Sequence, residues 1–147
     1  MSVPKGKRTE SKLQVLVELQ VLCTYTIQIC KNEKHFPKRD RWILTQHIVK
    51  AAVEAYATAR KANAVRVVTM DDYKYRRDCQ IQCKSCLEAL LGLIDIAYMA
   101  LSLDGDRVEF WTRQVIGAEE KLAAWRAGDR KRYRELLKDG NAEEAKP

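Results

Sequence analysis

Glycine, proline and histidine are scarce in this chain of 147 residues, which has 6 Gly, 3 Pro and 2 His. Glycine and proline interrupt regular structure, so their scarcity leaves long stretches free to form helices. His35 and His47 have no serine, cysteine or acidic partner at a catalytic spacing, and no glycine-rich phosphate loop is present. We therefore expect a protein that is not an enzyme and needs no cofactor.

Long apolar runs are also missing, since none reaches the ~18 residues of a membrane-spanning helix. The first residues, Met1 to Lys12, are basic and polar and lack the apolar stretch of a secretory signal. The five cysteines are an odd number and do not suggest a disulfide framework. These features predict a cytoplasmic protein that does not contact a membrane.

Apolar residues recur at steps of three and four, most clearly from Tyr73 to Leu103. The stretches 11–31, 38–63 and 105–127 have the same period, and such helices must pack against one another. We predict an all-α fold, an up-down-up-down four-helix bundle at 11–127. A flexible basic arm at 1–10 precedes it, and a basic helical extension and disordered tail at 128–147 follow it. Asp71 or Asp72 is expected to cap the third helix, Asp104 or Asp106 to cap the fourth, and Gly128 to end it.

Three cysteines, Cys79, Cys83 and Cys86, have the spacing of a loop that holds an iron–sulfur cluster. The same spacing is i, i+4, i+7 on the apolar stripe of a helix, and cysteine packs like a small apolar residue. Zinc would need a fourth ligand, for which only Cys23 and Cys30 remain as cysteines. Packing in the core is the prediction, without a metal.

The positive charge is clustered, although the net charge is only +7. Met1–Lys12 and Lys31–Arg41 each have a net charge of +3, and Arg60–Arg77 and Arg126–Lys138 each have +4. Such clusters favour a surface for a polyanion, and the alternative is a solvated surface that keeps the protein soluble. Beside them, Trp42, Tyr73 and Tyr75 are candidates for stacking on bases, whereas Trp111 and Trp125 are expected in the core.

Three segments together resemble a known family. They are His35-Phe-Pro-Lys-Arg-Asp-Arg-Trp42, Ala59-Arg-Lys-Ala-Asn63 and Leu122-Ala-Ala-Trp125. They resemble the accessory variability determinant (Avd) proteins of diversity-generating retroelements. They are also similar to the four-helix proteins encoded within intervening sequences of bacterial 23S ribosomal RNA genes. The resemblance covers roughly 13–126, and it departs from the family at Ala123 and Ala124, where glycines are frequent, and in the basic segment 130–134.

The resemblance implies a basic homopentamer that binds a reverse transcriptase, template-repeat RNA and cDNA. In that role it supports mutagenic cDNA synthesis, or retrohoming, and has no catalytic residues. The family's basic surface maps onto Lys38, Arg39, Arg41, Arg60, Lys61 and Arg66. The charge clusters add Arg76, Arg77, Arg126, Arg130, Lys131 and Arg132 as candidate nucleic-acid-binding residues. The alternative is a protein-only interaction module of the intervening-sequence type.

Overall fold

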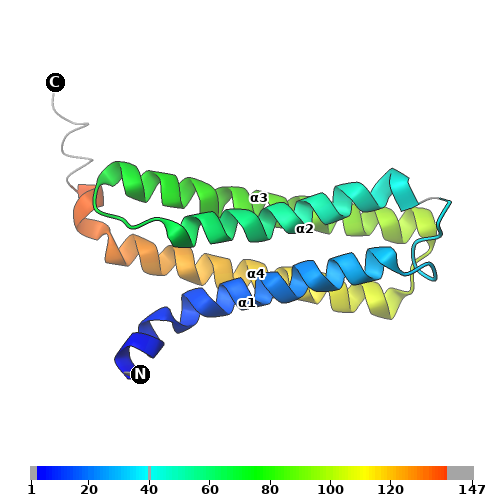
Figure 1. The fold of residues 1–147 in the computed structure, drawn as a ribbon, viewed down its shortest axis with the longest axis horizontal. Helices are drawn as coiled ribbons and strands as arrows, with labels where there is room; N and C mark the ends of the chain where they lie inside the picture. Colours follow the sequence, from blue (N-terminus) through cyan, green and yellow to red (C-terminus); the bar gives the residue numbers. More distant parts are fainter. Residues whose placement is uncertain (1–2, 40, 139–147) are drawn as a thin grey trace.

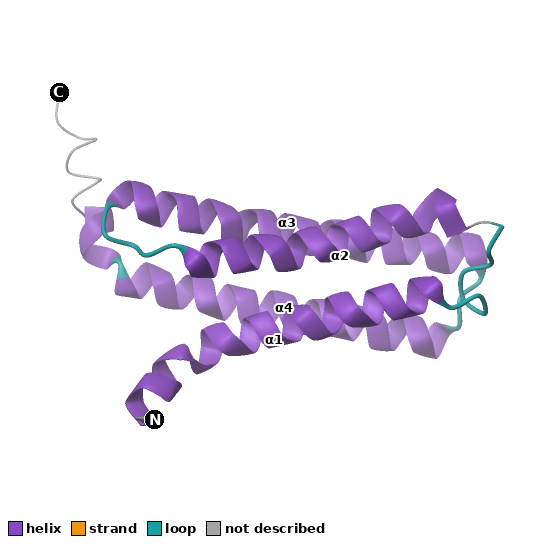
Figure 2. Cartoon of the chain, viewed as in Figure 1, coloured by secondary structure: helices purple, strands orange, loops and turns teal. Residues whose placement is uncertain are grey.

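The protein consists of four long helices, as a computed structural model shows for residues 3–39 and 41–138, with side chains described from Gln14 onward. These helices are α1 (Val3–Lys31), α2 (Arg41–Ala64), α3 (Met70–Leu101) and α4 (Gly105–Arg132). Figure 2 shows helices joined by short loops, and the described part of the chain has no strand. The prediction of an all-α fold is confirmed.

Each helix packs against two others: α1 and α3 each lie beside both α2 and α4. In Figure 1 the α1–α2 and α3–α4 connections lie together at one end of the molecule, which we call the loop end. The α2–α3 connection lies at the opposite end, together with the last turn of α4, and we call this the tail end. At 1.5 Å per residue, α2 alone separates the two ends by roughly 35 Å.

The core is built from the stripes that the sequence indicates. Leu87, Leu90 and Ile94 of α3 are fully buried, as are Trp111 and Leu122 of α4. On α2 the buried residues are mostly small, and they are Thr45, Ile48, Ala51, Ala52, Ala55, Thr58, Ala59 and Ala62. Short side chains let α2 approach its neighbours closely, so the larger residues of α1, α3 and α4 supply most of the buried apolar area.

The helix caps follow the sequence signals in part. The prediction for α4 is confirmed, because the Asp104 carboxylate accepts a hydrogen bond from the backbone N–H of Arg107 at 3.2 Å. The prediction for α3 is wrong by a few residues, because Thr69 is the N-cap. Asp72 instead accepts from the backbone N–H of Thr69 at 3.0 Å, and Thr69 Oγ1 accepts from that of Asp72 at 3.2 Å. This is a capping box, whose backbone hydrogen bonds lower the pKa of Asp72.

Two helices are longer than the sequence predicts. α1 begins at Val3 and not near Ser11, so residues 3–10 of the predicted flexible arm are helical, and Pro4 suits a first helical turn. α4 continues past Gly128 to Arg132, because Asp129 is buried and holds the last turn against the bundle. A further helical turn covers 134–138, as predicted, while the predicted disordered tail at 139–147 lies outside the described residues. None of the described helices is long and apolar enough to cross a membrane.

Candidate nucleic-acid interface

The twelve predicted nucleic-acid-binding residues divide between the two ends of the molecule. Lys38, Arg39 and Arg41 belong to the loop end, and the other nine belong to the tail end. The nine come from the last turn of α2, the α2–α3 connection, the first turns of α3 and the last turns of α4. Segments that are more than 45 residues apart in the sequence therefore meet at the tail end.

Charge is distributed unequally between these ends. At the tail end, segments 60–78 and 126–138 contain twelve basic and five acidic residues, a net charge of +7 that equals that of the whole chain. At the loop end, segments 31–41 and 102–109 contain six basic and five acidic residues, a net charge of +1. The start of α4 contributes Asp104, Asp106 and Glu109, which offset the basic cluster beside Lys38. The tail end is therefore the stronger candidate for binding a polyanion.

Most of the tail-end cations face solvent. Arg60, Lys61, Arg66, Arg130, Lys131 and Arg132 are exposed, and Arg77 and Arg126 are half-buried. Arg77 lies 3.7 Å from the Asp78 carboxylate and stacks over the Tyr73 ring. Exposed guanidinium and ammonium groups of this kind bind phosphate oxygens without reading the base sequence.

Arg76 is an exception, and its prediction as a nucleic-acid-binding residue is wrong. Its side chain is only 2% exposed, and its guanidinium donates to both carboxylate oxygens of Asp129, at 2.6 and 3.0 Å. A third donor, the side-chain amide Nε2 of Gln80, donates to the same carboxylate at 2.9 Å. A buried arginine needs such a partner, because an unpaired charge inside a protein is strongly unfavourable.

The same guanidinium also reaches α2 and a cluster of aromatic rings. Arg76 Nη1 donates to the carbonyl oxygens of Ala62 and Val65, both at 3.4 Å. Its carbon Cζ lies 5.2 Å from the centre of the Trp125 ring and 6.0 Å from that of Tyr133. Arg76 on α3 thus contacts the end of α2 and the end of α4 at once.

A sequence signal for this pair exists, although counting only apolar residues misses it. Arg76 lies three residues before Cys79 and Asp129 lies four residues after Trp125, so each continues the buried stripe of its helix. A basic residue on the buried face of one helix and an acidic residue on the buried face of another, both at the same end of a bundle, indicate a buried ion pair.

The aromatic candidates also divide. Trp42 and Tyr75 are exposed, at 69% and 56%, whereas Tyr73 is buried edge-on against Tyr133 and has no face to offer a base. Trp111 and Trp125 are buried in the core, as predicted. The Trp111 indole N–H donates to Thr26 Oγ1 at 3.0 Å and joins α4 to α1.

At the loop end, the Arg41 side chain contacts other residues of the protein. Its Nη2 donates to the carbonyl oxygen of Lys31, at the last residue of α1, at 3.2 Å, and lies 4.0 Å from the Glu33 carboxylate. A cation at the carboxyl end of a helix is favoured by the helix dipole. Lys38 and Arg39 remain exposed there.

The cysteines pack as predicted. Cys79 and Cys83 are buried in the core, and Cys86 is half-buried with its Sγ 3.8 Å from Glu54. Burial raises the pKa of the Cys83 thiol to about 12. Within the described ranges, no three His, Cys, Asp or Glu side chains are placed to hold a metal ion.

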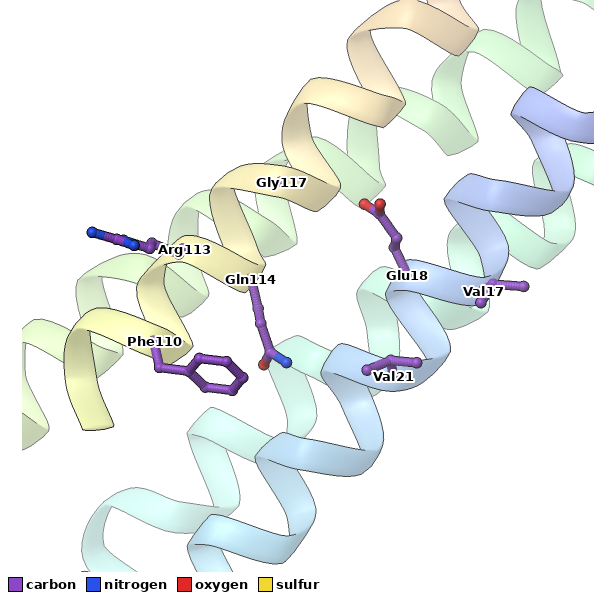
Figure 3. Close-up of a pocket in the computed structure, with 7 residues that line it drawn as sticks. All are labelled: Val17, Glu18, Val21, Phe110, Arg113, Gln114 and Gly117. Atoms are coloured by element: carbon purple, nitrogen blue, oxygen red, sulfur yellow. The ribbon is translucent and has the colours of Figure 1, made fainter. Parts of the chain in front are cut away.

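Two apolar grooves run along opposite flanks of the bundle. Figure 3 shows the first, of about 470 Å³, between α1 and α4, where Val21 of α1 and Phe110, Gln114 and Gly117 of α4 are among the lining residues. The second, of about 490 Å³, lies between α2 and α3 and includes Ala89, Gly92 and Ile96. Each groove contains a helical glycine whose missing Cβ would meet no atom closer than 3.9 Å, so packing within the chain does not require glycine there.

A carboxyl pair joins α3 and α4 outside these grooves. Burial and the neighbouring Glu88 carboxyl raise the pKa of Glu119 from 4.5 to about 7. Lys84 opposes this shift. Glu119 can therefore hold a proton near neutral pH.

Searches with this chain match no protein-family model, no curated protein and no solved structure.

Proposed function

We propose that this chain is a non-enzymatic accessory subunit of a diversity-generating retroelement. It binds structured RNA and the cDNA copied from it, and holds them near a reverse transcriptase during mutagenic cDNA synthesis in the cytoplasm. The resemblance of 35–42, 59–63 and 122–125 to Avd proteins suggests the role. The concentration of a +7 net charge at the tail end is the observation that supports it most.

The charge argument is one of counterion release. Each phosphate that is neutralised by lysine or arginine releases condensed cations, so affinity falls steeply with salt. The eight candidates at the tail end other than Arg76 are exposed or half-buried and come from three helices and the α2–α3 connection, so several phosphates can be contacted at once. The loop end, with a net charge of +1, offers much less.

The proposal includes assembly into a homopentamer, in which the four helices of each subunit have the up-down-up-down order expected for this family. The two apolar grooves differ in their residues and lie on opposite flanks. Such faces suit a head-to-tail contact between copies, which closes into a ring when the rotation permits. Gly92 and Gly117 favour this, because glycine within a helix costs up to about 1 kcal/mol and allows a neighbouring helix to come close. A ring places five basic ends side by side and multiplies weak phosphate contacts.

The experiment for nucleic-acid binding compares two triple variants with the same loss of charge. Arg60→Gln/Lys61→Gln/Arg66→Gln removes three tail-end cations, and Lys34→Gln/Lys38→Gln/Arg39→Gln removes three loop-end cations. Binding of a fluorescent single-stranded RNA is measured across a salt series. If the three tail-end cations contact phosphates, the slope of log K against log salt becomes shallower by about 2 in the first variant and changes little in the second.

Failure of the wild type to bind RNA at physiological salt would contradict the proposal and favour the protein-only interaction module. Equal losses in the two triple variants would contradict the assignment to the tail end. The partner is tested by looking for a reverse transcriptase gene beside this one and by co-purification of its product with this protein, and the absence of either would remove the retroelement role.

The ring is tested by complementation. Val21→Asp places a charge in the α1/α4 groove, and Ile96→Asp places one in the α2/α3 groove. Wild type is expected at five chains of 17.0 kDa, or 85 kDa, by light scattering, and each variant as a monomer. A mixture of the two variants retains one intact groove of each kind and is expected to form heterodimers. Monomeric wild type, or a mixture that stays monomeric, would contradict a head-to-tail ring.

A further inference from the structure

The exposed and half-buried cations of the tail end lie on three segments of the chain. Arg60, Lys61 and Arg66 lie on the end of α2 and the connection after it. Arg77 lies on the first turns of α3, and 126–132 on the last turns of α4. Like charges at close range repel, so these segments would move apart unless an attractive contact opposed them.

The Arg76 side chain supplies such a contact at the point where the three segments meet. Its two hydrogen bonds to Asp129 hold the end of α4 against α3. Its two hydrogen bonds to the carbonyls of Ala62 and Val65 hold the end of α2 and the following connection. The Ala62 carbonyl lies in the last turn of α2 and also accepts from the backbone N–H of Val65 at 3.2 Å, and a cation is the donor that the helix dipole favours there.

The backbone next to each contact carries exposed cations. Ala62 follows Arg60 and Lys61 directly, and Val65 precedes Arg66. Asp129 precedes Arg130, Lys131 and Arg132. Tyr133 then lies against Tyr73 at 5.7 Å between ring centres, and its backbone N–H donates to the Asp129 carbonyl at 2.9 Å. The last turn of α4 is thereby fixed both by the ion pair and by an aromatic contact.

We propose that Arg76 and Asp129 form a buried clamp that positions the phosphate-binding cations of the tail end, without contacting nucleic acid themselves. This inference rests on the proposed function. A clamp of this kind lets one stretch of polyanion engage cations of all three segments simultaneously. Because the cations are held in place before binding, less conformational entropy is lost when RNA binds.

The test replaces both members of the pair by apolar residues of similar size, as Arg76→Met/Asp129→Leu. The net charge remains +7, because one charge of each sign is removed. Buried ion pairs are often replaced in this way without loss of stability, whereas removing one partner leaves a buried charge unpaired. The double variant therefore tests whether RNA binding depends on how the exposed cations are positioned, because the net charge does not change.

We expect the double variant to keep the helical circular dichroism and the oligomer size of the wild type. Its affinity for single-stranded RNA should fall about tenfold, and its salt slope should become shallower, since fewer phosphates are contacted together. Trypsin should cleave faster after Arg130, Lys131 and Arg132, because the last turn of α4 opens more often. The matched control is Glu33→Gln/Lys34→Gln, a charge-neutral change of two exposed residues at the loop end that should alter none of these values.

A second variant, Arg76→Lys, tests the clamp if the double variant does not fold. Lysine keeps the charge and can pair with Asp129, but it lacks the planar fork that also reaches the α2 carbonyls. We expect an affinity between those of the wild type and the double variant. Unchanged RNA affinity and salt slope in a folded variant would overturn the clamp while leaving the proposed function standing. A wild type that binds no RNA would instead overturn the proposed function.

Discussion

The guanidinium of Arg76 faces the carboxylate of Asp129, 53 residues further along the chain, with both side chains almost completely buried. The pair joins the beginning of α3 to the end of α4. Breaking it from one side should be costly, because it leaves a buried charge without compensation.

Asp129→Asn keeps the shape of the side chain and removes its charge. We expect the free energy of unfolding to fall by about 3–5 kcal/mol, the usual cost of leaving one member of a buried ion pair. Urea denaturation monitored by circular dichroism measures this. Glu109→Gln, which breaks the exposed pair with Arg113 on α4, is the control and should cost less than about 1 kcal/mol. Equal effects of the two substitutions would show that the buried pair is not structurally important.

The hydrogen bond from the Trp111 indole to Thr26 is a second buried contact between helices. Thr26→Val keeps the shape and removes the acceptor, so the indole N–H is left unsatisfied in the core. We expect a loss of about 1–3 kcal/mol in the free energy of unfolding. Thr24→Val is the control, because Thr24 is exposed and bonds only to the Gln20 carbonyl of its own helix. A Thr26→Val protein as stable as the control would contradict the prediction.

Because the pKa of Glu119 is raised in the folded protein, we expect the stability of the protein to depend on pH. This pKa is raised from 4.5 to about 7 in the folded protein, so the folded state binds the proton more tightly than the unfolded chain. The contribution of Glu119 to stability is therefore fully present below pH 4.5 and is lost as the pH rises toward 7.

We expect Glu119→Gln to remove this part of the pH dependence and to raise the melting temperature at pH 7.5 relative to the wild type. Thermal melts between pH 4 and 8 measure the effect. The exposed neighbour Glu120 provides the matched control, since Glu120→Gln should follow the wild-type curve. A Glu119→Gln curve parallel to that of the wild type would contradict the assignment.

Cysteine reactivity provides a test of the core. With the Cys83 pKa at about 12, only about one thiol in ten thousand is a thiolate at pH 8, and the side chain is also fully buried. We expect iodoacetamide to modify the half-buried Cys23 and Cys86 first, and Cys83 only when urea unfolds the protein. Mass spectrometry of tryptic peptides gives the order of modification. Rapid labelling of Cys83 in the native protein would contradict the packing described.

The helices and most of the core are predictable from the sequence, because the spacing of apolar residues determines which face of a helix is buried. Leu87, Leu90 and Ile94 illustrate this. The sequence does not reveal the role of Arg76, since charge suggests the surface and only the pairing with Asp129 across the bundle reverses that expectation. The end of α4 differs from the prediction for the same reason, because a glycine at 128 suggests a stop whereas the buried Asp129 extends the helix.

The division of the candidate cations between two ends follows from the predicted helices, because a helix over 38–63 separates Arg39 and Arg41 from Arg60 by its whole length. The unequal net charge of the two ends is found only when the neighbouring ends of the other helices are counted with them. The acidic residues at the start of α4 then offset the first cluster.

The unequal ends also have a consequence for the approach of a partner. Residues outside 60–78 and 126–138 include fifteen basic and fifteen acidic residues, so they contribute no net charge. A long molecule with its excess charge near one end has a dipole along its axis, and a distant polyanion exerts a torque on it. If the tail end binds a polyanion as proposed, the protein turns that end toward it before contact, which raises the productive fraction of encounters at low ionic strength. Selection of the binding orientation would then begin while the two molecules are still separated by water.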